Sequence, residues 1–98
     1  MKLVWSELAV ERAYDEAGFI AEDKPDAALE WLEGLFRCTD RLERFPQSGQ
    51  VVPEIGRPEY RQVVYKSHRV VYQMDQAEIT ILTVRRFKQR LDTSEFLR

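Results

Sequence analysis

The chain has 98 residues, of which 44% are hydrophobic and 33% charged, and its formal net charge is -2. This length supports one modest hydrophobic core, so we predict a single domain over residues 1–98. The composition excludes a disordered tail. An apolar run of about 18 residues and a leader-like N-terminus are both missing, which excludes a membrane-spanning protein. We therefore expect a cytoplasmic protein.

The chain contains one cysteine, Cys38, and one histidine, His68. An internal disulfide is excluded, and a structural zinc site built from these residue types is disfavoured. We expect neither a metal nor a cofactor.

Charge is distributed unevenly along the chain. Residues 1–44 contain six Lys/Arg and eleven Asp/Glu, whereas residues 57–98 contain nine and five. The second half therefore has a basic surface to offer to an acidic partner, although the whole chain is slightly acidic.

The first half predicts a strand and two helices. Lys2 to Trp5 is a short apolar strand, and Ser6 is a good N-cap for a helix from Glu7 to Glu22. Gly18 weakens that helix or allows a close helix contact. Pro25 starts a second helix that runs to Arg44, because proline is tolerated in a first turn. The expected buried stripes are Val10, Ala13, Tyr14, Ala17, Ile20 and Ala21 on the first helix, and Ala28, Leu32, Leu35, Phe36, Thr39 and Leu42 on the second. Trp31 and Cys38 are interpreted as packing residues at the margin.

Phe45 to Pro58 contains three prolines and two glycines, which predicts a loop that crosses from the helices to a sheet. A β-hairpin follows, because Tyr60 to Tyr72 contains two runs of valine and tyrosine, broken at Lys66-Ser67-His68. A fourth strand is expected from Ile79 to Val84, followed by the basic run Arg85 to Arg90.

The length of the hairpin loop decides the faces of the sheet. A two-residue loop pairs Tyr65 with His68 and separates Arg61 from Arg69, whereas a three-residue loop pairs Tyr65 with Arg69 and places both arginines on one open face. We favour the three-residue loop because it leaves both cations on the exposed side. The alternative interpretation is that Arg61 and Arg69 are ordinary solvated arginines of a strand.

These elements predict an α+β fold of order β-α-α-β-β-β. The N-terminal helical hairpin covers one face of an antiparallel sheet and leaves the other face open for a site.

An ordered series of short segments resembles the ParE/RelE superfamily of bacterial toxins from type II toxin-antitoxin modules, and resembles the ParE branch most. The series comprises Val4-Trp5-Ser6, Ala9, Tyr14 to Ile20, Ala21-Glu22-Asp23, Ala28, Leu42, Phe45-Pro46, Ser48-Gly49, Val52-Pro53-Glu54, Arg61, His68 to Tyr72 and Ile81 to Arg85. The resemblance implies a curved sheet and a cognate antitoxin whose C-terminal segment wraps the toxin, by a helix in a groove or an added strand. It is also compatible with a homodimer or a larger toxin-antitoxin complex.

The two branches imply different activities. ParE-like members inhibit DNA gyrase and block replication, for which a binding surface suffices, and we assign that surface to Arg61, Arg69, Arg85 and Arg86. RelE-like members cleave messenger RNA on the ribosome; here Arg61 and Arg69 would hold the phosphate, with His68 or Glu59 as base. Val63 and Phe96 stand where that branch has a basic residue and a tyrosine. The sequence therefore favours a gyrase-binding protein over a ribonuclease, with a non-toxic antitoxin-binding relative as a third reading.

Overall fold

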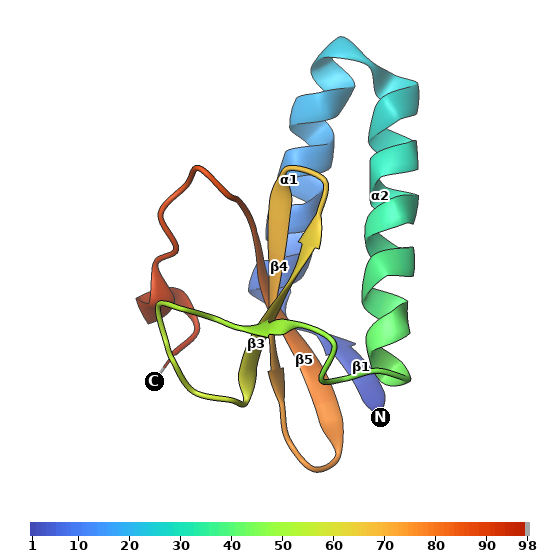
Figure 1. Cartoon of the computed structure of the whole chain (residues 1–98). Coiled ribbons are helices and arrows are strands. Elements are labelled where there is room, and N and C mark those ends of the chain that lie inside the picture. The colour runs from blue at the N-terminus through green and yellow to red at the C-terminus, as the bar shows by residue number, and fades with distance from the viewer. Residues whose placement is uncertain (98) are drawn as a thin grey trace.

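The computed structural model describes residues 1–97, and Figure 1 shows a pair of helices beside a sheet. In chain order the elements are β1 (Lys2–Trp5), α1 (Glu7–Asp23), α2 (Pro25–Asp40), the 3₁₀ helix η1 (Arg41–Glu43), β2 (Gln50–Val51), β3 (Tyr60–Tyr65), β4 (His68–Met74), β5 (Glu78–Arg86) and the 3₁₀ helix η2 (Thr93–Glu95). The predicted α+β class and element order are confirmed, with β2 as an additional short strand. None of the helices in residues 1–97 is long and apolar enough to cross a membrane.

The strands form one mixed sheet in the order β1-β5-β4-β3-β2. Strands β2, β3, β4 and β5 pair with one another in antiparallel fashion, as predicted for the hairpin and the last strand. The N-terminal strand β1 pairs with β5 in parallel. Parallel neighbours need a long crossover connection, and here nearly the whole chain separates the two strands. The N-terminal strand therefore closes one edge of the sheet, and the two-residue β2 covers only part of the other.

The helix boundaries follow their capping residues. The Ser6 side chain accepts a hydrogen bond from the backbone N–H of Ala9, and Pro25 occupies the first turn of α2. The second helix was predicted to run to Arg44. It is an α-helix only to Asp40, and the 3₁₀ helix η1 follows to Glu43. The two helices form the expected hairpin and extend beyond the sheet (Figure 1).

The buried stripe of α1 is rotated from the prediction. Ala9, Ala13 and Ala17 are buried, whereas Val10 and Tyr14, predicted to be buried, are 40% and 56% exposed. Alanines let the helix approach α2 and β5 closely, which outweighs the burial of larger side chains one position away. On α2, Trp31 is likewise central rather than marginal, and contacts Tyr65 and His68.

The predicted register of the β3–β4 hairpin is wrong. The loop has two residues, Lys66 and Ser67, and Tyr65 pairs with His68. Because side chains alternate between faces, this shift by one position moves Arg69 to the face opposite Arg61. Arg61, Val63 and Tyr65 lie on the helix side, with Val70 and Tyr72, and Val64 faces the other way.

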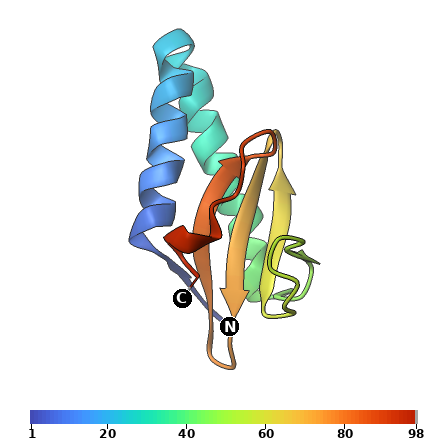
Figure 2. The ribbon, with the colours of Figure 1, turned by 90° about the vertical axis from the view of Figure 1, so that its left-hand side faces the viewer.

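The face opposite the helices is not open, so that prediction is also wrong. A second hydrophobic cluster covers it, with Val52, Tyr60, Val71, Leu82 and Leu91 buried and Ile55, Phe96 and Leu97 packed against them. The loop before β3 and the C-terminal segment supply five of these eight residues, and Figure 2 shows that segment returning across β5. Each face of the sheet therefore has its own core.

Tyr72 anchors the loop between the helices and the sheet. Its hydroxyl donates to the Pro46 carbonyl (2.7 Å) and accepts from the Gly49 N–H (3.0 Å), and its ring is fully buried. A Cβ on Gly49 would lie 2.6 Å from this hydroxyl, so the contact needs glycine. Burial raises the pKa of Tyr72, which keeps the hydroxyl protonated as a donor.

We predict that Tyr72→Phe lowers the free energy of unfolding by about 1–3 kcal/mol, because it leaves two buried backbone groups without a partner. Chemical denaturation measures the change. Tyr14→Phe is the matched control, since the Tyr14 ring is 56% exposed, and we expect no measurable effect. Equal losses in the two variants would contradict the anchoring role.

The helical glycines give a second test. Gly18 makes no close helix contact, because a Cβ there meets nothing within 4 Å, whereas a Cβ on Gly34 would lie 2.2 Å from the Tyr65 hydroxyl. We expect Gly18→Ala to stabilise by about 0.5–1 kcal/mol and Gly34→Ala to destabilise by about 1–3 kcal/mol. Thermal unfolding of both variants decides the signs.

Candidate functional site

Arg69, predicted to be free, is buried in an ion pair. Its Nη1 and Nη2 donate to the Glu54 carboxylate at 3.0 and 2.6 Å, and Nη1 also donates to Gln62 Oε1 at 3.1 Å. Only 8% of the Arg69 side chain is exposed. Bonds of this bidentate kind fix an arginine firmly. Arg69 therefore ties β4 to the loop that carries Glu54.

Arg61 is occupied by the backbone of the same loop. Its Nε donates to Pro58 O at 2.9 Å, and its Nη1 donates to Gly49 O at 3.1 Å and, less well, to Gln47 O at 3.4 Å. Arg61 lies on the helix side of the sheet and Arg69 on the other, so the two guanidinium groups do not form the shared phosphate-holding pair predicted for a nuclease.

His68 is buried beneath α1, and its Nε2 lies 3.0 Å from Glu16 Oε2, which also accepts from Arg86 Nε at 3.1 Å. The ring packs edge-on against Trp31. These contacts hold β4 and β5 to α1. The second base candidate, Glu59, lies elsewhere and accepts from Arg57 Nε at 2.8 Å.

The remaining predicted residues lie on β5. Arg85 faces Arg69 across the strands and donates from Nη2 to the Arg90 carbonyl, whereas Arg86 lies on the helix side over the Phe19 ring. Arg86 is 42% exposed. Phe96 packs against the second core, and Cys38 is a half-buried thiol whose pKa is raised by burial.

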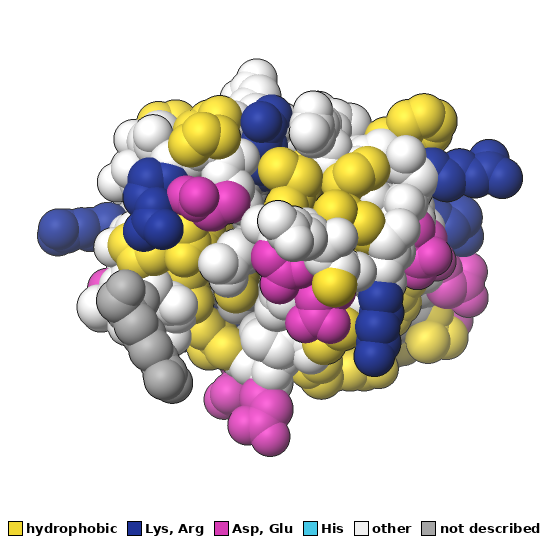
Figure 3. All heavy atoms as spheres, turned by 90° about the horizontal axis from the view of Figure 1, so that it is seen from below, with side chains coloured by type: hydrophobic (Ala, Val, Ile, Leu, Met, Phe, Trp, Pro, Cys, Tyr) yellow, Lys and Arg dark blue, Asp and Glu magenta, His cyan; other side chains and the backbone are white. Residues whose placement is uncertain are grey.

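On the face seen in Figure 3, the exposed cations do not form one continuous basic patch. The segment after β5 carries Lys88 and Arg90, both exposed. Figure 3 shows Lys and Arg side chains spread around the rim of one face, with Asp and Glu between them. The basic character of the second half is thus partly neutralised by carboxylates from the first half and the loop.

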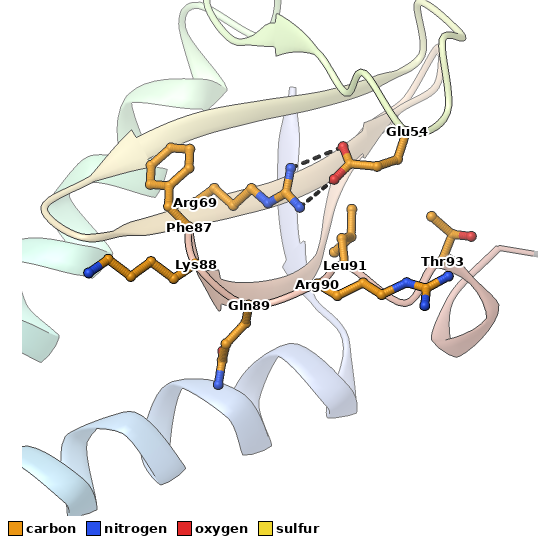
Figure 4. A pocket seen from close by; sticks show the side chains of 8 residues that line it. All are labelled: Glu54, Arg69, Phe87, Lys88, Gln89, Arg90, Leu91 and Thr93. Atoms are coloured by element: carbon orange, nitrogen blue, oxygen red, sulfur yellow. Dashed lines mark hydrogen bonds and ion pairs between the residues drawn. The ribbon is translucent and has the colours of Figure 1, made fainter.

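A pocket of about 560 Å³ lies beside the Arg69–Glu54 pair, and we call it the Arg69 pocket. It is lined by Glu54, Arg69 and most of the segment from Phe87 to Thr93 (Figure 4). Within residues 1–97, no group of three or more His, Cys, Asp or Glu side chains is placed to hold a metal ion. The pocket is suited to binding through charge and hydrogen bonds.

Sequence reasoning did not identify Glu54 and Gln62 as partners of Arg69, or Glu16 as the partner of His68 and Arg86. The signal for Glu54 was a lone carboxylate in a loop that leads into the basic half. Because pairing depends on which strand face each arginine occupies, the partners of Arg69 and Arg86 follow from the register and the helix rotation.

Hydrogen bonds from Arg69 lower the pKa of the Glu54 carboxyl below its usual value. A depressed carboxyl pKa contributes stability above the unfolded-state pKa, about 4.3 for Glu, and this contribution is lost as pH falls through the folded-state pKa. The pair therefore stabilises the fold at neutral pH and weakens in acid.

We predict that Glu54→Gln lowers the free energy of unfolding by about 1–3 kcal/mol at pH 7, because it leaves a buried guanidinium without its counter-charge. The difference from the parent protein should shrink below about pH 4. Urea denaturation across pH measures both. Glu59→Gln removes an exposed ion pair and should change stability by less than about 0.5 kcal/mol. A constant difference at all pH values would contradict the assignment.

Residues 3–91 match the family model described as ParE toxin of type II toxin-antitoxin system, parDE. No match was found among curated proteins.

Two solved structures share the fold. A structure titled "Chromosomal ParDE TA system from P. aeruginosa" superposes with a TM-score of 0.75 at 19% identity, covering 88% of this chain and 95% of that one. The "YoeB/ParE toxin from Agrobacterium tumefaciens" superposes with a TM-score of 0.60 at 18% identity, covering 88% and 98%. At these identities the likeness concerns the fold.

Proposed function

The chain belongs to the ParE toxin family of type II toxin-antitoxin systems, and from this premise we propose that it inhibits bacterial DNA gyrase by binding and is neutralised by a cognate antitoxin. The observation that carries the proposal is the separation of the candidate nuclease groups. Arg61 and Arg69 lie on opposite faces of the sheet, and His68 is buried against Glu16.

This arrangement disfavours cleavage of RNA by the residues first suggested. Phosphodiester cleavage requires a base and cations around one phosphate. Here Arg61 is bound to loop carbonyls, Arg69 to Glu54, and Glu59 to Arg57. Inhibition by binding needs only an exposed surface, and it is the function that this geometry supports best.

We place the gyrase-binding surface at the end of β5 and the segment that follows it. Arg86, Lys88 and Arg90 are the cations with exposed side chains there, and Phe87 is 47% exposed between them. Arg85 lies at the inner edge of this surface, while Arg61 and Arg69 support it by holding the loops in place. Exposed cations around an aromatic side chain are typical of a surface that recognises an acidic partner.

The antitoxin also needs an apolar surface. Tyr14, Phe19 and Leu29 are exposed on the helical hairpin, at 56%, 64% and 63%. Val64 is 59% exposed on β3, beyond the two residues that β2 pairs. A wrapping segment that lays a helix on the first set, or adds a strand beside β3, would cover these side chains.

A supercoiling assay with purified gyrase tests the activity. We expect the toxin to inhibit supercoiling at micromolar concentration. Lys88→Gln with Arg90→Gln should raise the concentration for half-inhibition about tenfold, since two rim charges at about 0.7 kcal/mol each amount to about 1.4 kcal/mol. Arg37→Gln with Arg41→Gln, two exposed cations of α2 and η1, is the control and should leave inhibition unchanged.

Two results would replace this proposal. Absence of gyrase inhibition together with cleavage of ribosome-bound message would favour the ribonuclease function. Normal growth of cells that express soluble toxin without antitoxin would favour a non-toxic antitoxin-binding relative.

A further inference from the structure

Arg69 has one edge of its guanidinium unused. A guanidinium carries five N–H groups. Glu54 accepts from two of them and Gln62 from a third. The Nε–H and one N–H of Nη2 remain, and they point in parallel from the same edge. The Nε atom is buried and has no hydrogen-bond partner within residues 1–97.

Two more buried groups without a partner lie on the same face of the sheet. Arg85 is opposite Arg69 on β5, and Thr83 precedes it by two residues, on the same side of the strand. Arg85 Nε and Thr83 Oγ1 are both buried and unpartnered within the described residues. Opposite residues of neighbouring strands are about 5 Å apart at Cβ, so Arg69 and Arg85 lie side by side. Thr83 lies opposite Val71 and is 1% exposed.

The charges around this region are unbalanced. The Arg69 pocket and an adjoining pocket of about 490 Å³ are lined by four cations: Arg69, Arg85, Lys88 and Arg90. Glu54 and Asp92 are the two carboxylates that face them, since the third, Glu95, pairs with Arg12 at 2.8 Å. Two positive charges therefore remain without a counter-charge in the described residues.

We propose that the Arg69 pocket binds the carboxylate of an Asp or Glu side chain from an acidic segment of a partner protein. The free edge of Arg69 holds the two carboxylate oxygens, with Arg85 Nε as a further donor. The other edge of the Arg69 guanidinium already holds a carboxylate in this way, that of Glu54. That the antitoxin supplies this segment rests on the proposed function.

A carboxylate suits the pocket better than a phosphate. The planar fork of an arginine edge matches a carboxylate oxygen for oxygen. A doubly charged phosphate would lie near Glu54 and Asp92, and both would repel it more strongly than they repel a singly charged carboxylate. The rim also contains Phe87 and Leu91, which offer apolar contact to the residues that flank an acidic side chain in a peptide.

The test follows the arginine Nε–H signals of ¹⁵N-labelled toxin by NMR. The probes are two blocked peptides, one of alternating glutamate and leucine and the other with glutamine in place of glutamate. We expect the acidic peptide to shift the Nε–H signals of Arg69 and Arg85, and the glutamine peptide to bind at least about tenfold more weakly.

Two conservative variants locate the site. Arg85→Lys keeps the positive charge and removes the Nε donor, so it should weaken binding of the acidic peptide several-fold without unfolding the protein. Arg57→Lys makes the same change at an exposed side chain away from both pockets and should leave binding unchanged. Equal effects of the two variants would overturn the assignment of Arg85 Nε as a donor.

Either of two further results would overturn the proposal. One is a folded protein whose Arg69 and Arg85 signals do not respond to the acidic peptide. The other is a response of the same signals to inorganic phosphate, at equal ionic strength, at lower concentration than to the peptide. Gyrase inhibition by the toxin alone does not involve the carboxylate, so a negative NMR result with retained inhibition would overturn this inference and leave the proposed function standing.

Discussion

The two-residue turn at Lys66 and Ser67 is the constraint on which the rest of the structure depends. Lys66 adopts the left-handed conformation, with φ of 52°, and the chain reverses at once into β4. Since side chains alternate along a strand, this turn decides the face of every residue in β3 and β4. It places Val70 and Tyr72 under the helices and Arg69 on the opposite side.

The loop between α2 and β3 is then held by both faces of the sheet. Tyr72 and Arg61 bind its backbone from the helix side, at Pro46, Gly49 and Pro58. Arg69 binds Glu54 of the same loop from the other side. Buried polar groups normally have partners, and here the partners are supplied by a segment without regular structure. The same bonds that fold the loop therefore occupy the two arginines that first suggested a nuclease site.

In this ParE-type chain, Arg61 and one edge of Arg69 hold the fold, and other cations remain available for recognition. The arginines inside the sheet are hydrogen-bonded to loop carbonyls and to a carboxylate, whereas Lys88 and Arg90 after β5 remain at the surface beside the Arg69 pocket. A protein that acts by binding can keep its exposed charges on a short terminal segment, because no proton transfer has to be positioned. The basic surface at the end of β5 shares Phe87, Lys88 and Arg90 with the Arg69 pocket, whereas the apolar surface on the helical hairpin lies in another part of the sequence.

The sequence by itself determined the family, the α+β class and nearly every element, and these predictions are confirmed. Such features depend on local signals: Ser6 and Pro25 at helix starts, and runs of valine and tyrosine in strands. Only the tertiary structure determined which face of the sheet or helix each side chain occupies. The choice between two turn lengths, one residue apart, sent Arg69 to the opposite face from Arg61. The close approach allowed by Ala9, Ala13 and Ala17 rotated α1, and the apolar C-terminal segment covered a face predicted to be open. Each of these outcomes depends on contacts between distant segments, which no local pattern encodes.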